Sequence, residues 1–329
     1  MKKSLSVIGV IVGVFALAFA FTACASTGGS GGGSGGSSAP LAKWSNVANP
    51  GFGTSYIRAL FFDGGKFFAA GDRGAMAYSA DGISWTTVNS SFDGVRIQSI
   101  TYGNGTYVAV GDNSKAAYST NGTSWTAAEG IPISKILVVI FANGVFVAGG
   151  GEGDVKLAYS GDGTSWTVTD STFGESDVNA IAYGDGKFVA AGTGGRMAYS
   201  EDGINWTAIA DSGFGKNDSI NAIVYDGKGT FSAGGTAGAA AYSNDGINWT
   251  GVKTDSKIFD NKDIRRMAYG NGKFITGGAG GIIAYSPDGL NWEPVRYGFE
   301  DRLILSVAYG NGKFVIGGQD GKMAYTLDE

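Results

Sequence analysis

The sequence predicts an all-β protein built from repeated units of four short strands, and three observations carry this prediction. Seven tryptophans recur at intervals of 40 to 43 residues along a chain of 329 residues, and a fixed period near forty is typical of repeat architectures. The chain holds 58 glycines, whereas average usage of about 7% would give about 23. Its apolar segments have the length of strands and are separated by Gly, Asn and Asp turns, with no helical periodicity.

The fourth repeat shows the four strands most clearly. Its apolar segments span residues 178–183, 187–191, 196–200 and 206–209. Asp185-Gly186 separates the first two segments, and other repeats have Asn-Gly there, for example Asn104-Gly105. Such turns supply the positive φ angles of a two-residue hairpin, so we expect antiparallel strands. A four-stranded antiparallel unit of about 40–45 residues, repeated around an axis, is a β-propeller blade.

The number of repeats predicts seven blades and the way in which the ring closes. Seven first strands begin at equivalent positions: Ile57, Ile97, Ile136, Val178, Ile220, Ile264 and Ile304. The seventh repeat stops shortly after its third strand, and a matching tryptophan strand stands at the other end of this region, at residues 44–47. We therefore predict a seven-bladed β-propeller of four-stranded antiparallel blades, closed by the N-terminal strand around Trp44.

The turn between the third and fourth strands has the pattern Ser-x-Asp-Gly-x-x-Trp in six repeats, with Asn in place of Asp in one. The residues at its third position are Asp81, Asn121, Asp162, Asp202, Asp245 and Asp288. A side chain that caps its own turn, a Gly with positive φ and a Trp that packs between blades explain this pattern structurally. The carboxylates also invite a metal-binding or catalytic interpretation, but the same residue in every blade argues against a single active site.

This turn resembles the Asp-box, or BNR, repeat of sialidase-like and photosystem-assembly-factor-like propellers. The spacing here is one residue tighter than the commonest Asp-box pattern, so the resemblance is to the broader superfamily, and it covers the chain after residue 40. It implies that function gathers on the face where the innermost strands begin. That face is formed by the fourth-to-first strand connections and the second-to-third strand turns, and loops on a rigid scaffold are where binding residues concentrate.

The first 40 residues have the composition of a targeting segment followed by a tether. Lys2 and Lys3 precede an apolar run at residues 7–21, which is shorter than a membrane-spanning helix of about 20 residues and is typical of a secretory signal. Residues 21–24 resemble the lipobox of bacterial lipoproteins, which implies that Cys24, the only cysteine, is lipidated. The alternative is an ordinary cleaved signal. Residues 26–38 are almost entirely Gly and Ser and predict a flexible tether.

These segments predict three regions and a location. Residues 1–23 are a lipoprotein signal peptide, residues 24–40 are the lipidated Cys24 with the tether, and residues 41–329 are the propeller. Acyl chains on Cys24 would anchor the protein in a membrane. We therefore expect a monomeric, extracytoplasmic protein of the cell envelope, at the outer membrane or the cell surface.

Composition excludes several classes of function. The chain has no histidine, which removes Ser-His-Asp triads, Cys-His dyads and His-based metal sites. A single cysteine excludes intramolecular disulfides and thiolate clusters. A net charge of −5 argues against nucleic acid as a partner. We expect neither a cofactor nor a metal.

A ring of polar residues is predicted near the start of the first strands. Alignment of those strands brings seven residues to one position: Arg58, Gln98, Leu137, Asn179, Asn221, Arg265 and Leu305. Five of the seven are polar, and each of these five follows an Ile or Val, so this position is predicted to face the central channel. The residues leave open whether these side chains bind a ligand or only line a water-filled channel.

Charged residues concentrate in the connections before the sixth and seventh repeats. The connection at residues 250–263 runs into Arg265 and Arg266, and the next one carries Glu300, Asp301 and Arg302. Together with the ring position, this sector predicts a binding face composed of Arg58, Gln98, Asn179, Asn221, Arg265, Arg266 and Arg302. The alternative interpretation is a solvated rim.

The sequence favours a non-catalytic binding or assembly scaffold that presents this face to an envelope protein or an acidic ligand. The alternative, which the Asp-box resemblance implies, is a carbohydrate-binding or carbohydrate-hydrolysing, sialidase-like propeller. Such an enzyme needs three arginines, for which Arg58, Arg265 and Arg302 are candidates. It also needs a Tyr nucleophile with a Glu partner and an acid Asp, and no Tyr-Glu pair can be placed from the sequence.

Overall fold

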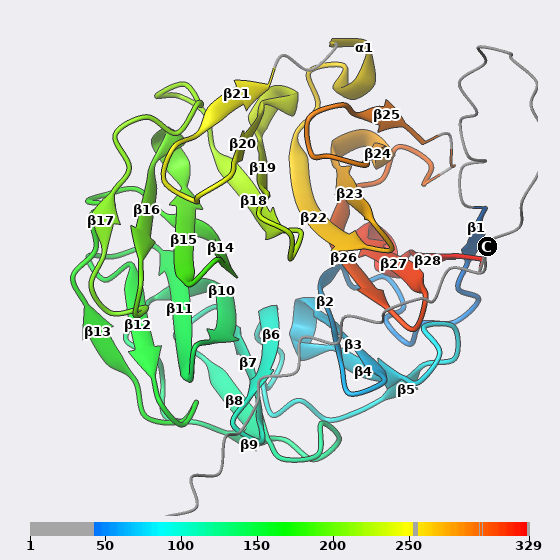
Figure 1. The fold of residues 1–329 in the computed structure, drawn as a ribbon. Helices are drawn as coiled ribbons and strands as arrows, with labels where there is room; N and C mark the ends of the chain where they lie inside the picture. Colours follow the sequence, from blue (N-terminus) through cyan, green and yellow to red (C-terminus); the bar gives the residue numbers. More distant parts are fainter. Residues whose placement is uncertain (1–42, 253–255, 296, 298, 328–329) are drawn as a thin grey trace, which may run out of the picture. The chain divides into compact units, whose positions relative to one another are not determined.

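Seven four-stranded antiparallel sheets form a closed ring in the computed structural model, which describes residues 43–252, 256–295, 297 and 299–327 (Figure 1). The predicted seven-bladed β-propeller is therefore confirmed. The predicted signal peptide, Cys24 and the tether lie outside the described residues. Helix α1, Ser256–Phe259, is the only α-helix in the part of the chain that is described.

The first three blades each consist of four consecutive strands. Blade 1 contains β2 (Ile57–Asp63), β3 (Lys66–Gly71), β4 (Met76–Ser79) and β5 (Thr86–Thr87). Blade 2 contains β6 (Ile97–Gly103), β7 (Thr106–Gly111), β8 (Ala116–Ser119) and β9 (Thr126–Ala127). Blade 3 contains β10 (Lys135–Ala142), β11 (Val145–Gly151), β12 (Leu157–Ser160) and β13 (Thr167–Thr169).

Blades 4 to 6 repeat this order. Blade 4 contains β14 (Val178–Gly184), β15 (Lys187–Gly192), β16 (Met197–Ser200) and β17 (Thr207–Ala208). Blade 5 contains β18 (Ile220–Tyr225), β19 (Phe231–Gly235), β20 (Ala240–Ser243) and β21 (Thr250–Val252). Blade 6 contains β22 (Ile264–Gly270), β23 (Lys273–Gly278), β24 (Ile283–Ser286) and β25 (Glu293–Pro294).

Blade 7 is completed by the N-terminal strand, as predicted. Its first three strands are β26 (Ile304–Gly310), β27 (Lys313–Gly318) and β28 (Met323–Thr326), and β1 (Trp44–Asn46) pairs antiparallel with β28. The Tyr297 hydroxyl donates a hydrogen bond of 2.7 Å to Asn46 Oδ1, and the Tyr297 ring lies 5.9 Å from that of Trp44. Side-chain contacts therefore support the backbone ladder that closes the ring.

Deletion of residues 41–48 is expected to lower the melting temperature by about 6–15 °C. The deletion removes the outer strand of blade 7 and the buried Val47, a loss of about 3–5 kcal/mol. Deletion of the Gly/Ser-rich residues 26–38 is the matched control and should change the melting temperature by no more than about 2 °C. Circular dichroism melts measure both, and equal melting temperatures for the two deletions would contradict this closure.

Neighbouring blades approach so closely at their inner strands that only glycine fits at some positions. A Cβ atom on Gly270 of β22 would lie 2.0 Å from the Tyr309 ring of β26. A Cβ atom on Gly310 of β26 would lie 2.2 Å from the Phe62 ring of β2, across the closure between blades 7 and 1. These distances are far below van der Waals contact, so the backbone of one blade packs directly on an aromatic ring of the next.

The six turns between third and fourth strands share one hydrogen-bond pattern. In blade 1, Asp81 Oδ1 accepts the backbone N–H groups of Ile83 and Ser84 at 2.8 and 2.7 Å. The Ser79 hydroxyl donates to the same oxygen at 2.9 Å. In blade 2, Asn121 Oδ1 accepts the equivalent three bonds, and in each turn the Trp indole donates to the Gly carbonyl. Each capping side chain is thus used by its own turn.

These hydrogen bonds keep the turn carboxylates ionised. Burial acts to raise the pKa of Asp81, but the backbone N–H groups of Ser84 and Ile83 outweigh it and lower this pKa to about 2. Equivalent bonds outweigh burial and lower the pKa of Asp162, Asp202, Asp245 and Asp288. A carboxylate with a lower pKa in the folded than in the unfolded chain stabilises the fold above the unfolded pKa.

Acid is therefore expected to remove the stabilisation that these turns supply. The loss should begin as the pH falls below about 4, the unfolded pKa of Asp, and continue toward pH 2. A variant with Asn at all five Asp positions should fold, because blade 2 already has Asn121 there. Urea midpoints at pH 6 and pH 2.5 should show a smaller acid loss for this variant than for the wild type, and an equal loss would argue against the turns as its source.

Candidate binding face and central cavity

Each blade carries one extra residue near the start of its innermost strand. In all seven blades the register between the first and second strands shifts, so a β-bulge leaves one first-strand residue unpaired. These residues are Arg58, Gln98, Leu137, Asn179, Asn221, Arg265 and Leu305. A bulge re-aims a side chain and increases the local twist, so the seven aligned positions share one structural environment.

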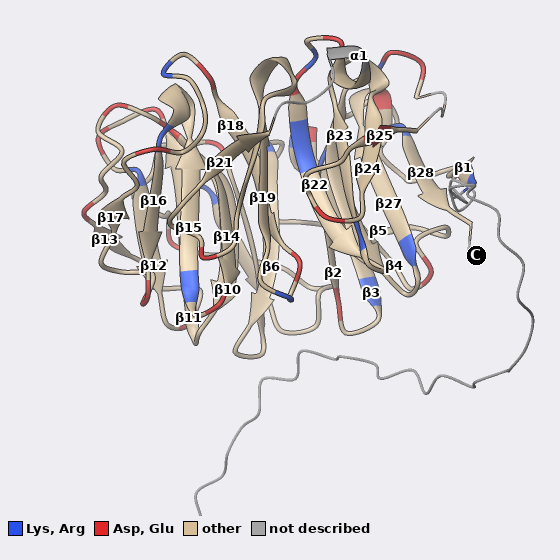
Figure 2. Ribbon diagram, turned by 45° about the horizontal axis from the view of Figure 1, so that its top comes forward, with Lys and Arg blue, Asp and Glu red and all other residues tan. Residues whose placement is uncertain are grey.

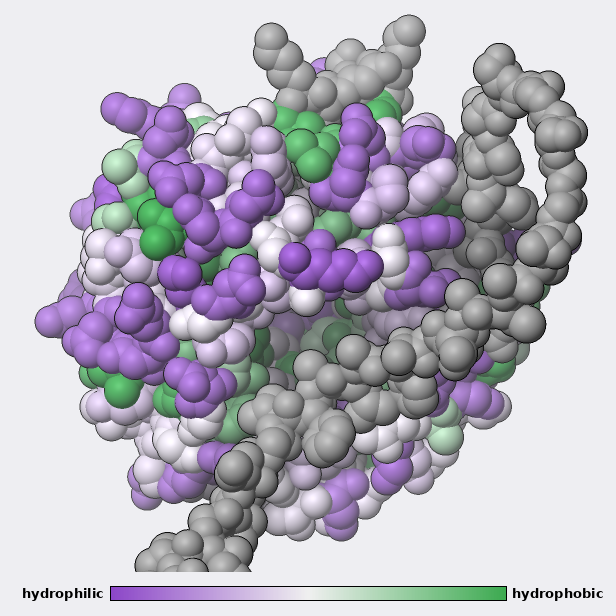
Figure 3. Space-filling model, viewed as in Figure 1, coloured by the Kyte–Doolittle hydropathy of each residue, from purple (hydrophilic) through white to green (hydrophobic). Residues whose placement is uncertain are grey.

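A cavity of about 160 Å³ lies between the first strands of the seven blades. The space-filling view is hollowed at the corresponding place, in the centre of the ring (Figure 3). The polar residues that line the cavity are Arg58, Gln98, Ser99, Asn179, Asn221, Arg266 and Ser306. Arg265 and Leu305 are not among the described lining residues, and in blade 6 the lining arginine is Arg266.

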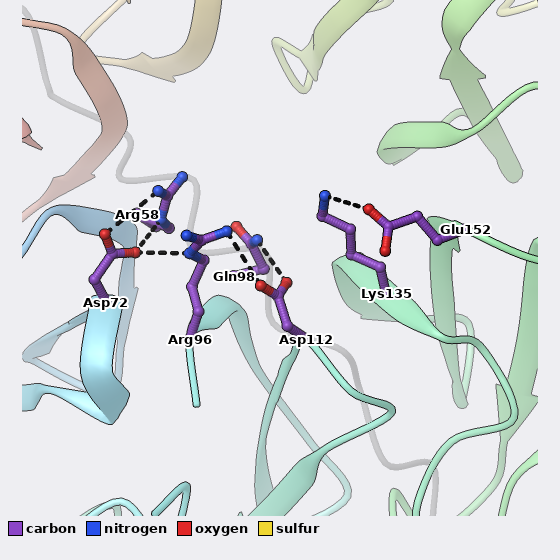
Figure 4. A network of polar contacts seen from close by, with 7 residues as sticks. All are labelled: Arg58, Asp72, Arg96, Gln98, Asp112, Lys135 and Glu152. Atoms are coloured by element: carbon purple, nitrogen blue, oxygen red, sulfur yellow. Dashed lines mark hydrogen bonds and ion pairs between the residues drawn. The ribbon is translucent and has the colours of Figure 1, made fainter. Parts of the chain in front are cut away.

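A chain of charged and polar groups crosses from blade 1 to blade 2 beside this cavity (Figure 4). Arg58 Nε lies 2.5 Å from Asp72 Oδ1, and Arg96 Nε lies 2.8 Å from the same oxygen. Arg96 Nη1 in turn lies 3.1 Å from Asp112 Oδ2, and Gln98 Nε2 donates to Asp112 Oδ1 at 2.9 Å. Burial acts to raise the pKa of Asp72, but the guanidinium groups of Arg58 and Arg96 lower it.

Sequence reasoning missed Asp72 and Asp112 as members of this face. Each follows a glycine that ends the second strand of its blade, at Gly71 and Gly111, and this repeated Gly-Asp pair was an available signal. Because the pairing partners come from the next blade or from a residue at least 14 positions away, local spacing alone did not indicate which charges would meet.

The two ring asparagines tie neighbouring blades together. Asn179 Nδ2 donates to the backbone oxygen of Ile220 in blade 5 at 3.1 Å. Asn221 Nδ2 donates to the backbone oxygen of Ile264 in blade 6 at 2.9 Å. One donor group of each amide is thus used by the fold, although both residues line the cavity.

Arg302 belongs to a different cluster from the other predicted binding residues. Its guanidinium pairs with Glu300 and, at 3.2 Å through Nε, with Asp320. Together with Asn46 and Lys322 these residues line a second hollow at the edge of blade 7, and Arg302 does not line the central cavity. The structure therefore does not bring Arg58, Arg265 and Arg302 together as a trio.

Strand β22 carries the consecutive arginines of blade 6, of which Arg266 lines the cavity, and Figure 2 shows a basic segment on this strand. Arg265 Nη2 lies 2.8 Å from Asp263 Oδ2, and Arg265 Nε is buried without a hydrogen-bond partner. Arg266 Nη1 donates to the backbone oxygens of Asn221 and Arg265 at 3.3 and 2.8 Å. Burial, and then the charges of Arg265 and Arg58, lower the pKa of Arg266 to about 10.

The cavity offers binding groups but few groups for proton transfer. Its described lining contains guanidinium, amide and hydroxyl groups and no Asp, Glu, Tyr, Cys or Lys side chain. Among the described residues, no group of three or more His, Cys, Asp or Glu side chains is positioned to hold a metal ion. No helix within the described ranges has the length and apolar character needed to cross a membrane.

Comparison with solved structures shows that the fold belongs to the β-propeller class. No protein-family model matches the chain, and no curated protein matches its sequence. The particular similarities therefore come from structure alone.

Three solved propellers illustrate these similarities. YCF48 bound to a D1 peptide has a TM-score of 0.68 and 16% identity, over 87% of this chain and 97% of that one. YCF48 from Cyanidioschyzon merolae has a TM-score of 0.66 and 16% identity, over 87% and 99%. Virginiamycin B lyase from Staphylococcus aureus has a TM-score of 0.73 and 11% identity, over 87% and 99%. A fold found both in a peptide-bound protein and in a lyase assigns neither role by itself.

Proposed function

We propose that this chain is a non-catalytic scaffold that binds an acidic segment of another protein on the face around the central cavity. The observation that carries this proposal is the cavity lining, which has guanidinium and amide groups and no described carboxylate, Tyr, Cys or Lys. Guanidinium and amide groups bind carboxylates and backbone carbonyls. At neutral pH they supply neither a general base nor a nucleophile.

The charges around the cavity support an acidic partner. The chain as a whole has a net charge of −5, yet Arg58 and Arg266 line the cavity and Arg265 lies beside them. Local positive charge on an acidic protein attracts a complementary segment and disfavours other acidic surfaces. A propeller of the same fold, YCF48, is bound to a D1 peptide, and this supports a protein as the partner.

The proposal also places the protein in the cell envelope and relates it to the Asp-box propellers. The charged and apolar start of the chain and the position of Cys24 support a lipid-anchored protein of the cell envelope that faces away from the cytoplasm. The repeated Ser-x-Asp-Gly-x-x-Trp turn supports a relationship to the Asp-box propellers. In this picture the Gly/Ser-rich tether lets the propeller reach partners at some distance from the membrane.

The double substitution Arg265→Glu and Arg266→Glu is expected to reduce capture of the partner from solubilised cell envelope at least tenfold. It reverses the charge at the cavity, whereas the control Arg196→Glu changes an arginine of blade 4 that does not line the cavity. Quantitative mass spectrometry of the captured proteins measures the effect. Recovery of the same partners by wild type and double variant, or turnover of aryl glycosides or sialosides at enzyme-like rates, would overturn the proposal.

The lipid anchor is tested by Cys24→Ala. The wild type is expected in the detergent-rich phase after phase separation, because two or more acyl chains anchor a protein stably in a membrane or micelle. The variant should move to the aqueous phase. Cys24→Ser, which retains a polar side chain of similar size, should behave as the alanine variant does, and unchanged partition of both variants would exclude lipidation at this residue.

A further inference from the structure

Arg266 breaks the symmetry of the cavity lining. It stands directly after the bulge in its first strand, a position that lines the cavity in all seven blades. The other six blades have Ala59, Ser99, Val138, Ala180, Ala222 and Ser306 at this position. Small or aliphatic side chains satisfy the fold at this position in the other six blades. Packing alone therefore does not explain the guanidinium of Arg266 in blade 6.

Backbone carbonyls orient the Arg266 guanidinium, and among the described residues no carboxylate neutralises it. Its Nη1 donates to the backbone oxygens of Asn221 and Arg265. Within the described part of the chain, no Asp or Glu lies within ion-pair distance of Arg266. The Nε and Nη2 atoms have no hydrogen-bond partner there, and they are not among the fully buried unpaired atoms. Both atoms are therefore accessible to solvent, on a side chain that lines the cavity.

The arginines next to Arg266 are compensated, so the excess charge belongs to Arg266. Arg58 pairs with Asp72, and Arg265 pairs with Asp263. Burial and the charges of Arg265 and Arg58 lower the pKa of Arg266 to about 10, which still leaves the group charged at neutral pH. Further along the same strands the lining is apolar, with Leu60, Ile100, Ile181, Ile223, Met267 and Val307. Electrostatic interactions are stronger in such surroundings than in bulk water.

We propose that Arg266 binds one carboxylate group inside the central cavity, through Nε and Nη2, with Arg58 Nη1 as a further donor. Arg58 Nη1 also has no described hydrogen-bond partner and belongs to a side chain that lines the same cavity. A planar guanidinium matches a carboxylate in a bidentate geometry. One negative charge balances the one uncompensated guanidinium, and a cavity of about 160 Å³ has room for a small acid or one acidic side chain.

The carboxylate that Arg266 binds can come from either of two chemical sources. One is an acidic side chain or the C-terminus of the partner segment, and for this source the inference rests on the proposed function. The other is a free small carboxylic acid, which needs no protein partner. The experiment below distinguishes these sources with separate probes.

Two substitutions at position 266 separate binding from folding. Arg266→Ala introduces the residue that blades 1, 4 and 5 have at this position, so it should fold with an unchanged or higher melting temperature in the absence of ligand. Arg266→Lys keeps the charge and loses the bidentate fork. Arg196→Ala is the control, because Arg196 does not line the cavity.

Binding is measured by calorimetry and by ¹³C line broadening on the purified full chain, with acetate as the first probe and acetamide as its neutral analogue. Acetate is expected to saturate the wild type with a Kd of about 1 mM, as suits a ligand of four heavy atoms, and acetamide should not bind. Arg266→Ala should weaken acetate binding at least tenfold. The affinity of Arg266→Lys for acetate should lie between those of the wild type and Arg266→Ala, and Arg196→Ala should bind acetate as the wild type does. Absence of saturable binding, or equal affinity of wild type and Arg266→Ala, overturns the proposal.

A hexapeptide with one central Glu and its Gln analogue identify the source of the carboxylate. Tighter binding of the Glu peptide than of acetate, lost in Arg266→Ala, supports a partner segment as the source. Binding of acetate without a difference between the two peptides supports a free acid. If acetate binding requires Arg266 while capture of envelope proteins is unaffected by the charge reversal at 265 and 266, the carboxylate site stands and the scaffold function fails.

Discussion

The close approach of neighbouring sheets near the axis is the constraint on which the rest of this structure depends. A Cβ atom on Gly277 of blade 6 would lie 2.4 Å from Ile304 of blade 7, and one on Gly317 of blade 7 would lie 2.7 Å from Ile57 of blade 1. Six of the seven blades have Gly or Ala at this position of the second strand, and blade 2 has Val110. The glycine content of the chain follows from this close approach as well as from its turns, and a larger side chain at these positions would overpack the junction.

The same close approach decides which polar side chains are consumed by the fold. Arg96 of blade 2 reaches Asp72 of blade 1, and the amides of Asn179 and Asn221 reach backbone oxygens of the next blade. These residues line or flank the cavity, but the Arg96 guanidinium and the two amide groups form hydrogen bonds or ion pairs between neighbouring blades. Arg266 is the exception, since it adds a charge to the cavity and no carboxylate of the described residues pairs with it. The other six blades fold with Ala, Ser or Val at the position of Arg266, and this departure from the repeat marks the candidate site.

Several elements were predictable from the sequence because their determinants are local. The hairpin at Asp185-Gly186 and the capped turns depend on side chains within a few residues of each other. The outer strands were less predictable: residues 206–209 were expected to form a strand, and β17 is only Thr207–Ala208. Trp206 remains outside it, and its indole donates to the Gly203 carbonyl of the preceding turn. An outermost strand has one neighbour only, so few ladder bonds extend it.

The sequence by itself determined the period, the turn chemistry, the number of blades, the strand that closes the ring and the first-strand position where polar residues gather. Only the tertiary structure decided which of the consecutive residues Arg265 and Arg266 lines the cavity and that Arg302 lies in a separate cluster. It also decided that Asp72 pairs with Arg58 and that Asp112 accepts a hydrogen bond from Gln98. The physical reason is that successive side chains on a strand point to opposite sides, and a bulge reverses which side is which. Charge pairing then depends on distances between strands and between blades, which a repeated local pattern does not encode.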